Sequence, residues 1–156
     1  MPTPEWDIGT YLTFMQSQGV AHSVSSISSP GAGVFRGNKT ATLAIARLLN
    51  ENFAAYARTY PKRISFMAIP PLPFVQESLI EVDYALNTLK ASGIGLLTNY
   101  EGMYLGNPAL KDFFSTVNER YDHPIFFVHP TDPVMEVNGS FIEANPTLYP
   151  TGLVEY

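Results

Sequence analysis

Short apolar segments alternate with longer amphipathic ones along most of this chain. Three of the apolar segments begin near residues 64, 94 and 124. The stretches between them space their apolar residues three and four apart, which is the period of a helix with one buried face. Continuous apolar strands separated by such helices are typical of a parallel sheet covered by helices, so the pattern predicts an α/β fold. The strands are expected near 23–28, 64–69, 94–98 and 124–129.

The regular spacing of the strand starts bears on the choice between two parallel architectures. A period of thirty residues suits successive right-handed βα units of a (β/α)8 barrel at least as well as an open doubly wound sheet. The glycine motifs that bind nucleotides in open sheets follow none of the strands, since Gly31-Ala32-Gly33 lacks the third glycine. A complete barrel needs about 250 residues. We therefore expect a partial TIM-type barrel of about four βα units with parallel strands.

The length of the chain bounds its domain organisation. At 156 residues with 46% hydrophobic side chains, the chain can form one core of ordinary size. Residues 130–156 contain four prolines and no convincing period, which predicts a long irregular segment. We expect one partial barrel domain over 1–156 that ends in this irregular tail.

Composition narrows the classes of partner. A formal net charge of −5, without any cluster of lysine or arginine, argues against nucleic acid and against an anionic membrane as main partners. The absence of cysteine removes disulfides, thiolate nucleophiles and sulfur metal ligands. No apolar stretch approaches the roughly 18 residues of a membrane-spanning helix, and the N-terminus has no signal-peptide pattern. We expect a soluble cytoplasmic protein with a small-molecule ligand.

One histidine stands at the end of the last predicted strand. In parallel α/β folds the functional rim lies at the carboxyl ends of the strands, and His129 stands there between four apolar residues and Pro130. An imidazole at that point can bind a metal or transfer a proton. His22 and His123 precede their strands, so we expect them at the opposite, structural end of the sheet.

Polar residues in the other rim loops are weaker candidates. Arg36 could clamp a carboxylate with its planar guanidinium group, and a surface position without a role is the alternative. Asn99 follows the third strand, and Tyr100 could line an aromatic pocket in the loop after it. Glu101 and Asp132 could bind a metal or donate a proton, or could simply be solvated.

Five segments spread over nearly the whole chain resemble segments of one enzyme family. They are Ser26–Gly31, Tyr60–Ile64, Leu97–Tyr100, Tyr104–Pro108 and Phe126–Thr131. Each has low specificity alone, but their order and spacing together are hard to obtain by chance. The family they resemble is the amidohydrolase superfamily. The branch is that of the metal-dependent decarboxylases of aminocarboxymuconate semialdehyde, γ-resorcylate and 6-methylsalicylate.

The resemblance implies a distorted (β/α)8 barrel built around one divalent ion, zinc or manganese. His129 matches the metal-binding histidine after the fifth strand of that barrel, and the other ligands would lie outside the 156 residues. One imidazole alone cannot hold such an ion or activate water. The implied substrate is a small carboxylic acid that loses carbon dioxide without a redox cofactor. We expect Arg36, Asn99 and Tyr100 to bind this acid.

Three interpretations of function stay open on these residues. The first is a metal-dependent non-oxidative decarboxylase of an aromatic or muconate-type acid, with little activity from this chain alone. The second is a metal-dependent hydrolase of a lactone or an amide, because the same centre can activate water. The third is a non-catalytic truncated paralogue or a module that forms a homo-oligomer, because half a barrel leaves unpaired apolar edges.

Overall fold

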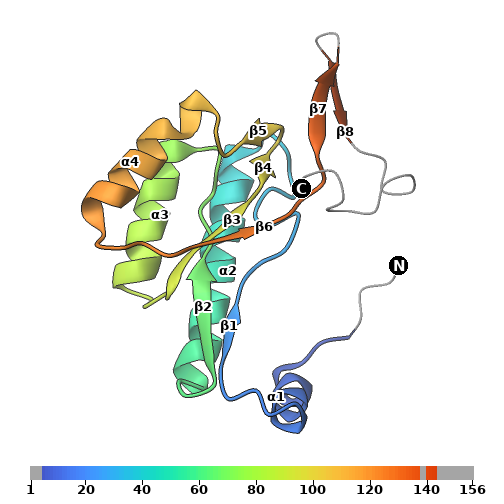
Figure 1. Cartoon of the computed structure of the whole chain (residues 1–156), viewed down its shortest axis with the longest axis vertical. Coiled ribbons are helices and arrows are strands. Elements are labelled where there is room, and N and C mark those ends of the chain that lie inside the picture. Colours follow the sequence, from blue (N-terminus) through green and yellow to red (C-terminus); the bar gives the residue numbers. More distant parts are fainter. Residues whose placement is uncertain (1–4, 138–139, 144–156) are drawn as a thin grey trace.

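The structure is a computed structural model that describes residues 5–137 and 140–143. Its centre is a four-stranded parallel sheet with the strand order β1-β2-β3-β6 (Figure 1). The strands of this sheet are β1 Ser23–Ser25, β2 Ile64–Ala68, β3 Gly93–Leu97 and β6 Phe126–His129. The sheet confirms the predicted α/β fold with about four βα units and parallel strands. β1 is shorter than expected because it pairs with β2 over three residues.

Helices fill the stretches between the strands, as the apolar spacing predicts. They are α1 Ile8–Ser17, α2 Lys39–Thr59, α3 Val75–Asn87, the short 3-10 helix η1 Pro108–Leu110 and α4 Lys111–Arg120. α2, α3 and α4 cover the sheet, whereas α1 lies apart near the start of β1 (Figure 1). Among the described residues, none of the helices combines the length and the apolar character that a membrane span requires.

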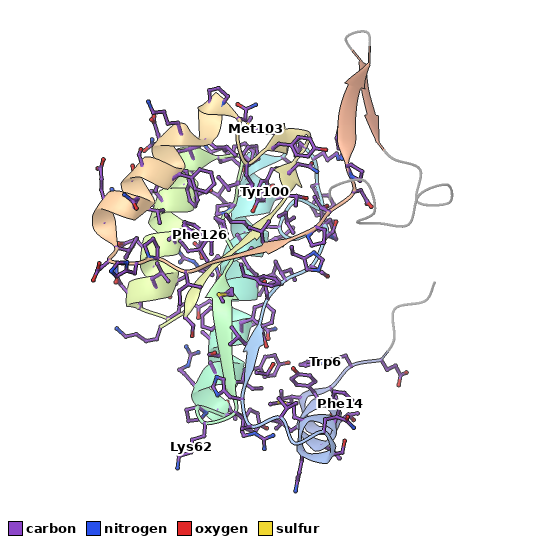
Figure 2. The ribbon with its side chains drawn as sticks, in the orientation of Figure 1. Trp6, Phe14, Lys62, Tyr100, Met103 and Phe126 are labelled. Carbon is purple, nitrogen blue, oxygen red and sulfur yellow. The ribbon has the colours of Figure 1, made fainter. Side chains whose placement is uncertain are left out.

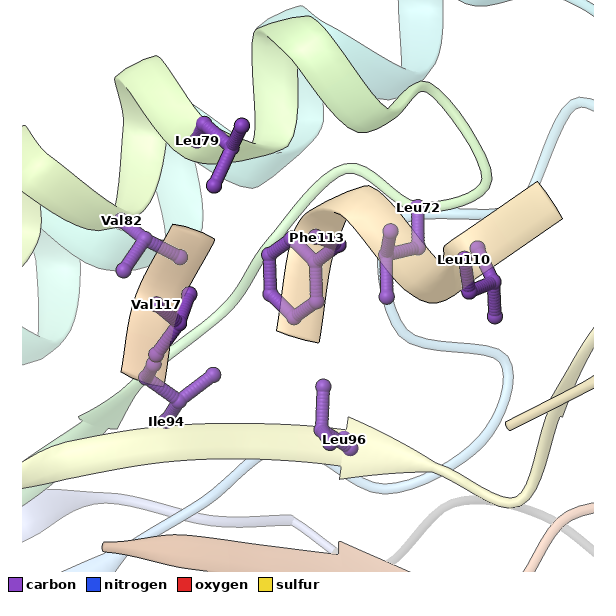
Figure 3. Close-up of a cluster of buried hydrophobic side chains, with 8 residues drawn as sticks. All are labelled: Leu72, Leu79, Val82, Ile94, Leu96, Leu110, Phe113 and Val117. Carbon is purple, nitrogen blue, oxygen red and sulfur yellow. The ribbon is translucent and has the colours of Figure 1, made fainter. Parts of the chain in front are cut away.

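Alternate residues of the strands are buried beneath the helices. Ile94 and Leu96 of β3 are at most 3% exposed and share a buried cluster with Phe113 of α4 (Figure 3). The parallel register places Phe126 of β6 beside Ile94, and its ring centroid lies 5.9 Å from that of Phe114. Because successive side chains of a strand point to opposite faces, Gly95 and the other odd-numbered residues of β3 and β6 face away from the helices. The helix-side cluster consists of Leu72, Leu79, Val82, Ile94, Leu96, Leu110, Phe113 and Val117.

A buried asparagine forms hydrogen bonds with the backbone N–H and carbonyl groups of the residue that follows β2. Asn50 of α2 is fully buried. Its Nδ2 donates to the Ile69 carbonyl (3.1 Å), and its Oδ1 accepts from the Ile69 backbone N–H (2.8 Å). The same Nδ2 donates to Glu81 Oε1 (2.8 Å), and Arg47 donates from Nε to Glu81 Oε2 (2.9 Å). The hydrogen bond with Glu81 raises the pKa of Arg47. Buried polar contacts thus join α2 and α3 to the segment that leaves β2.

One short hairpin occupies a segment that the sequence predicts to be a loop. β4 (Asn99–Tyr100) pairs antiparallel with β5 (Met103–Tyr104) immediately after β3. Two paired residues on each side are too few to produce the period of two on which strand prediction depends. The hairpin stands at the carboxyl end of the sheet (Figure 1).

A second hairpin corrects the prediction for the end of the chain. β7 (Val134–Val137) pairs antiparallel with β8 (Ser140–Glu143), so the predicted irregular segment over 130–156 is wrong for this part. The prediction overlooked the dipeptide Asn138-Gly139, a strong sequence signal for a hairpin between two strand-forming runs. Residues 144–156 lie outside the described residues, and the single domain over 1–156 stays a prediction.

β6 forms the outer edge of the sheet in the described part of the chain. Its apolar stretch, residues 125–128, is between 37% and 58% exposed. Strands of parallel sheets are normally covered on both faces. The exposed apolar side chains of residues 125–128 therefore leave room for a further element beside β6.

Candidate functional site

A pocket of about 120 Å³ lies at the carboxyl ends of the sheet strands. Its walls come from the loop after β1, the first turn of α2, the β4–β5 hairpin and the segment after β6. The polar lining residues are Ser29, Arg36, Thr42, Asn99, Tyr100, Glu101, Thr131 and Asp132. The pocket thus brings together the three residues predicted to bind the substrate acid, at the end of the sheet where parallel α/β folds carry their function.

Arg36 reaches this pocket from the loop between β1 and α2. The loop is held from the opposite wall, because the Gly37 backbone N–H donates to Glu101 Oε1 (2.7 Å). A guanidinium group at this position can bind a carboxylate through two parallel N–H groups. The carboxylate of Glu101 therefore accepts a hydrogen bond from a backbone amide. This contact differs from the metal-binding or proton-donating role that the sequence suggested for Glu101.

Tyr100 lines the pocket and lies near the centre of the view in Figure 2. The oxygen accepts a hydrogen bond from the Leu97 backbone N–H (3.0 Å). Burial raises the pKa of the Tyr100 hydroxyl, so this group stays protonated at neutral pH. A protonated hydroxyl group can donate a hydrogen bond to an oxygen acceptor.

Hydrogen bonds tie the walls of the pocket to one another. Asn99 Nδ2 donates to the Asp132 carbonyl (3.0 Å), and Asn99 Oδ1 accepts from the Gly102 N–H (3.2 Å). The hydroxyl oxygens of Ser29 and Thr131 lie 2.8 Å apart. Because Ser29 follows β1 and Thr131 follows β6, this contact joins the two edges of the sheet at their carboxyl ends. The sheet is curled around the pocket.

His129 ends β6, and its backbone carbonyl accepts a hydrogen bond from the Thr98 N–H (3.1 Å). The ring Nδ1 lies within hydrogen-bonding distance of the Pro130 carbonyl oxygen. Since a carbonyl can only accept, Nδ1 of the neutral ring carries the proton, and Nε2 keeps the lone pair with which an imidazole binds a metal. The register places His129 beside Leu97, on the face of the sheet away from the helices. Its role as a metal ligand stays a prediction.

A metal centre needs more than this one imidazole. Among the residues that the structure describes, no three histidine, aspartate or glutamate side chains gather closely enough to hold a metal ion. Zinc sites, whether structural or catalytic, use three or more protein ligands. The described residues therefore do not form a metal centre by themselves.

The other two histidines lie at the opposite end of the sheet, as predicted. His22 precedes β1, and its Nε2 is 3.0 Å from Ser65 Oγ near the start of β2. His123 precedes β6, and its Nε2 is 3.4 Å from Asp122 Oδ1, with both side chains 95% exposed. Neither histidine lines the pocket.

Three polar residues of the pocket were missed as site residues by the sequence reasoning. Ser29 directly follows the strand predicted over 23–28, and Thr131 lies two residues beyond the strand predicted over 124–129. Their positions place both on the predicted rim, but no role was assigned to them. Thr42 lies in the first turn of α2, where the helical pattern gives no sign that it faces a pocket.

Curated relatives match nearly the whole chain, whereas no family model matches it. The chain is 31% identical, over 98% of its length, to the decarboxylase yanB of Aspergillus niger. It is 29% identical, over 98% of its length, to the decarboxylase macB of Penicillium terrestre. It is 31% identical, over 84% of its length, to the 6-methylsalicylic acid decarboxylase of Penicillium expansum. The chain spans between 40% and 46% of the length of these relatives.

Solved structures agree with these relatives. A structure described as an amidohydrolase II has a TM-score of 0.79 and 29% identity, and the match covers 89% of this chain and 44% of that chain. The chain is related to the decarboxylases of the amidohydrolase superfamily. The 2,6-dihydroxybenzoate decarboxylase from Rhizobium shares the fold, with a TM-score of 0.73, 22% identity and coverage of 81% of this chain and 40% of that chain. These matches confirm that the curled sheet is part of a TIM-type barrel.

Proposed function

We propose that this chain is the part of a metal-dependent, non-oxidative decarboxylase that holds the carboxylic acid substrate. The observation that carries the proposal is the convergence of Arg36, Asn99 and Tyr100 on one pocket at the carboxyl ends of the strands. Relatives that match 98% of the chain are named decarboxylases, and another is named for 6-methylsalicylic acid. An aromatic acid with a neighbouring hydroxyl group is the substrate class that we propose.

Each pocket residue has a proposed part in holding such an acid. Arg36 binds the carboxylate through its guanidinium group. Tyr100 donates its proton to a carboxylate or hydroxyl oxygen of the acid, and Asn99 lines the pocket while fixing the rim through Asp132. These contacts orient the ring of the acid and the carboxyl group that leaves.

His129 is proposed as one ligand of a divalent ion, manganese or zinc. The remaining ligands would have to come from other parts of the protein. Structures of related decarboxylases are described with bound manganese. When bound, such an ion supplies positive charge that polarises an acid substrate.

Replacing Arg36 with glutamine is expected to weaken the binding of 6-methylsalicylate about fivefold, because a charge-assisted contact by an exposed side chain contributes on the order of 1 kcal/mol. Isothermal titration calorimetry of the 156-residue chain measures the dissociation constant. Arg58→Gln is the matched control, since Arg58 lies in the last turn of α2, about 24 Å along the helix from Thr42. Equal affinities of the wild type and Arg36→Gln would contradict the role of Arg36.

Hydrolysis of a lactone or an amide is the second candidate activity. It is favoured by structural neighbours that are described as amidohydrolases. The two activities differ in their product, because decarboxylation releases carbon dioxide and hydrolysis opens a ring or frees an amine. Assays for both products on the same preparation distinguish them.

The exposed edge at β6 supports a third candidate, a module that pairs with another copy without catalysing a reaction. A further strand beside residues 125–128, which are 37–58% exposed, would cover this edge. Such a strand could belong to the same barrel or to a second copy. The homo-oligomer and the cytoplasmic location stay predictions, and a small-molecule acid remains the proposed partner.

A further inference from the structure

The tip of the β4–β5 hairpin carries a glutamate in an unfavourable backbone conformation. Glu101 has a φ of 55° and Gly102 a φ of 87°, so both residues of the turn are in the left-handed region, as in a type I′ turn. Asparagine, aspartate or glycine normally takes the first position, because other side chains are disfavoured at positive φ. A glutamate at such a position points to a function of its side chain.

Within the part of the chain that the structure describes, the side chain of Glu101 reaches across the pocket rim to the loop after β1. Its Oε1 accepts a hydrogen bond from the Gly37 backbone N–H at 2.7 Å, between residues 64 positions apart in the sequence. Gly37 directly follows Arg36, has a φ of 65° and precedes Asn38, whose side chain caps α2 by accepting from the Ala41 N–H. The contact therefore fixes the backbone between Arg36 and the first turn of α2.

The hairpin that carries Glu101 is itself anchored on its other side. Asn99 donates to the carbonyl of Asp132 (3.0 Å), and the Tyr104 hydroxyl accepts from the Val134 N–H (3.0 Å). The hairpin thus contacts both the segment after β6 and the loop after β1, two segments that also meet directly through Ser29 and Thr131. Ser29 anchors the start of the loop after β1 to Thr131, and the hairpin holds the backbone next to Arg36 through Gly37.

We infer that Glu101 is a positioning residue, whose side chain holds the Arg36 loop where the guanidinium group can meet the carboxylate of the ligand. The inference rests on the proposed function, since it assumes that the pocket binds an acid. The role requires the hydrogen-bond acceptor of Glu101 and not its charge. Glutamine keeps the acceptor and alanine lacks it, and both remove the charge. The comparison of Glu101→Gln with Glu101→Ala therefore cancels the loss of charge and tests the acceptor together with the side-chain stem that carries it.

The experiment compares the two variants by two measurements. Amide hydrogen exchange followed by NMR should be about fivefold faster at Gly37 in Glu101→Ala than in Glu101→Gln, as expected for the loss of one hydrogen bond. Calorimetric titration with 6-methylsalicylate should give about fivefold weaker binding for Glu101→Ala than for Glu101→Gln. Glu119→Ala, at an exposed position of α4, is the control and should change neither quantity.

The outcomes separate this inference from the proposed function. Faster exchange together with weaker binding in Glu101→Ala supports the positioning role. Equal exchange in the two variants, or faster exchange with unchanged binding, would overturn it. A wild-type chain that does not bind 6-methylsalicylate would overturn the proposed function and the positioning role with it, even where exchange at Gly37 still confirms the contact.

Discussion

Replacing Asn50 with alanine is expected to lower the free energy of unfolding by about 3–5 kcal/mol, because it leaves buried groups without partners. Asn50 is fully buried and satisfies both the N–H and the carbonyl of Ile69 as well as one oxygen of Glu81. Each buried polar group left unpaired costs roughly 1–3 kcal/mol. Urea denaturation followed by circular dichroism measures the loss.

Asn87→Ala is the matched control for Asn50→Ala. Asn87 is also a helical asparagine with a side-chain contact, donating to Asp83 Oδ1 (2.9 Å), but this contact is exposed. Its removal should cost less than about 0.5 kcal/mol. If Asn50→Ala were no more destabilising than Asn87→Ala, the buried network would not stabilise the segment that leaves β2.

Replacing Gly93 with alanine is expected to destabilise the protein by about 2–3 kcal/mol through overpacking. A Cβ atom at Gly93 would lie 2.7 Å from the carbonyl oxygen of Ile125 and 2.9 Å from the sulfur of Met67. That carbonyl accepts the hydrogen bond of the Ile94 N–H (2.9 Å). Since the oxygen is a backbone atom, relief of the clash requires the backbone at Ile125, just before β6, to move away from β3. Thermal unfolding by calorimetry measures the change.

Gly106→Ala provides the control for this substitution. A Cβ atom at Gly106 would meet no atom within 4 Å, so the exchange of glycine for alanine should be close to neutral or slightly stabilising. A stability of Gly93→Ala equal to that of Gly106→Ala would show that β3 and β6 are not packed as closely as described.

The sheet and its helices could be predicted because each depends on local pattern. The alternation of apolar strands with amphipathic helices follows from the spacing of apolar residues in the sequence. Asn107 and Pro108 mark the start of the helical segment formed by η1 and α4. The β4–β5 hairpin could not be predicted in this way, because its strands have two residues each. The β7–β8 hairpin could have been found from the Asn-Gly dipeptide, which outweighs the prolines nearby.

The candidate site could be predicted only as far as the ends of the strands. That rule placed Asn99 and Tyr100 on the rim, and the planar guanidinium group singled out Arg36. Which groups meet there is decided by tertiary contacts, such as that between Glu101 and Gly37, for which the sequence carries no local pattern. The buried contacts of Asn50 could not be predicted either. A polar residue in a helix can form hydrogen bonds with solvent or with a buried backbone group, and the sequence does not distinguish the two.

The central claim is that the pocket at the carboxyl ends of the strands binds an aromatic carboxylic acid. An NMR titration of the ¹⁵N-labelled chain with 6-methylsalicylate tests it most directly, because every backbone amide reports its own surroundings. The account predicts that the shifts concentrate on the lining residues, above all Arg36, Asn99, Tyr100 and Thr131. The absence of shifts, or shifts confined to the exposed apolar residues 125–128 of the sheet edge, would contradict it.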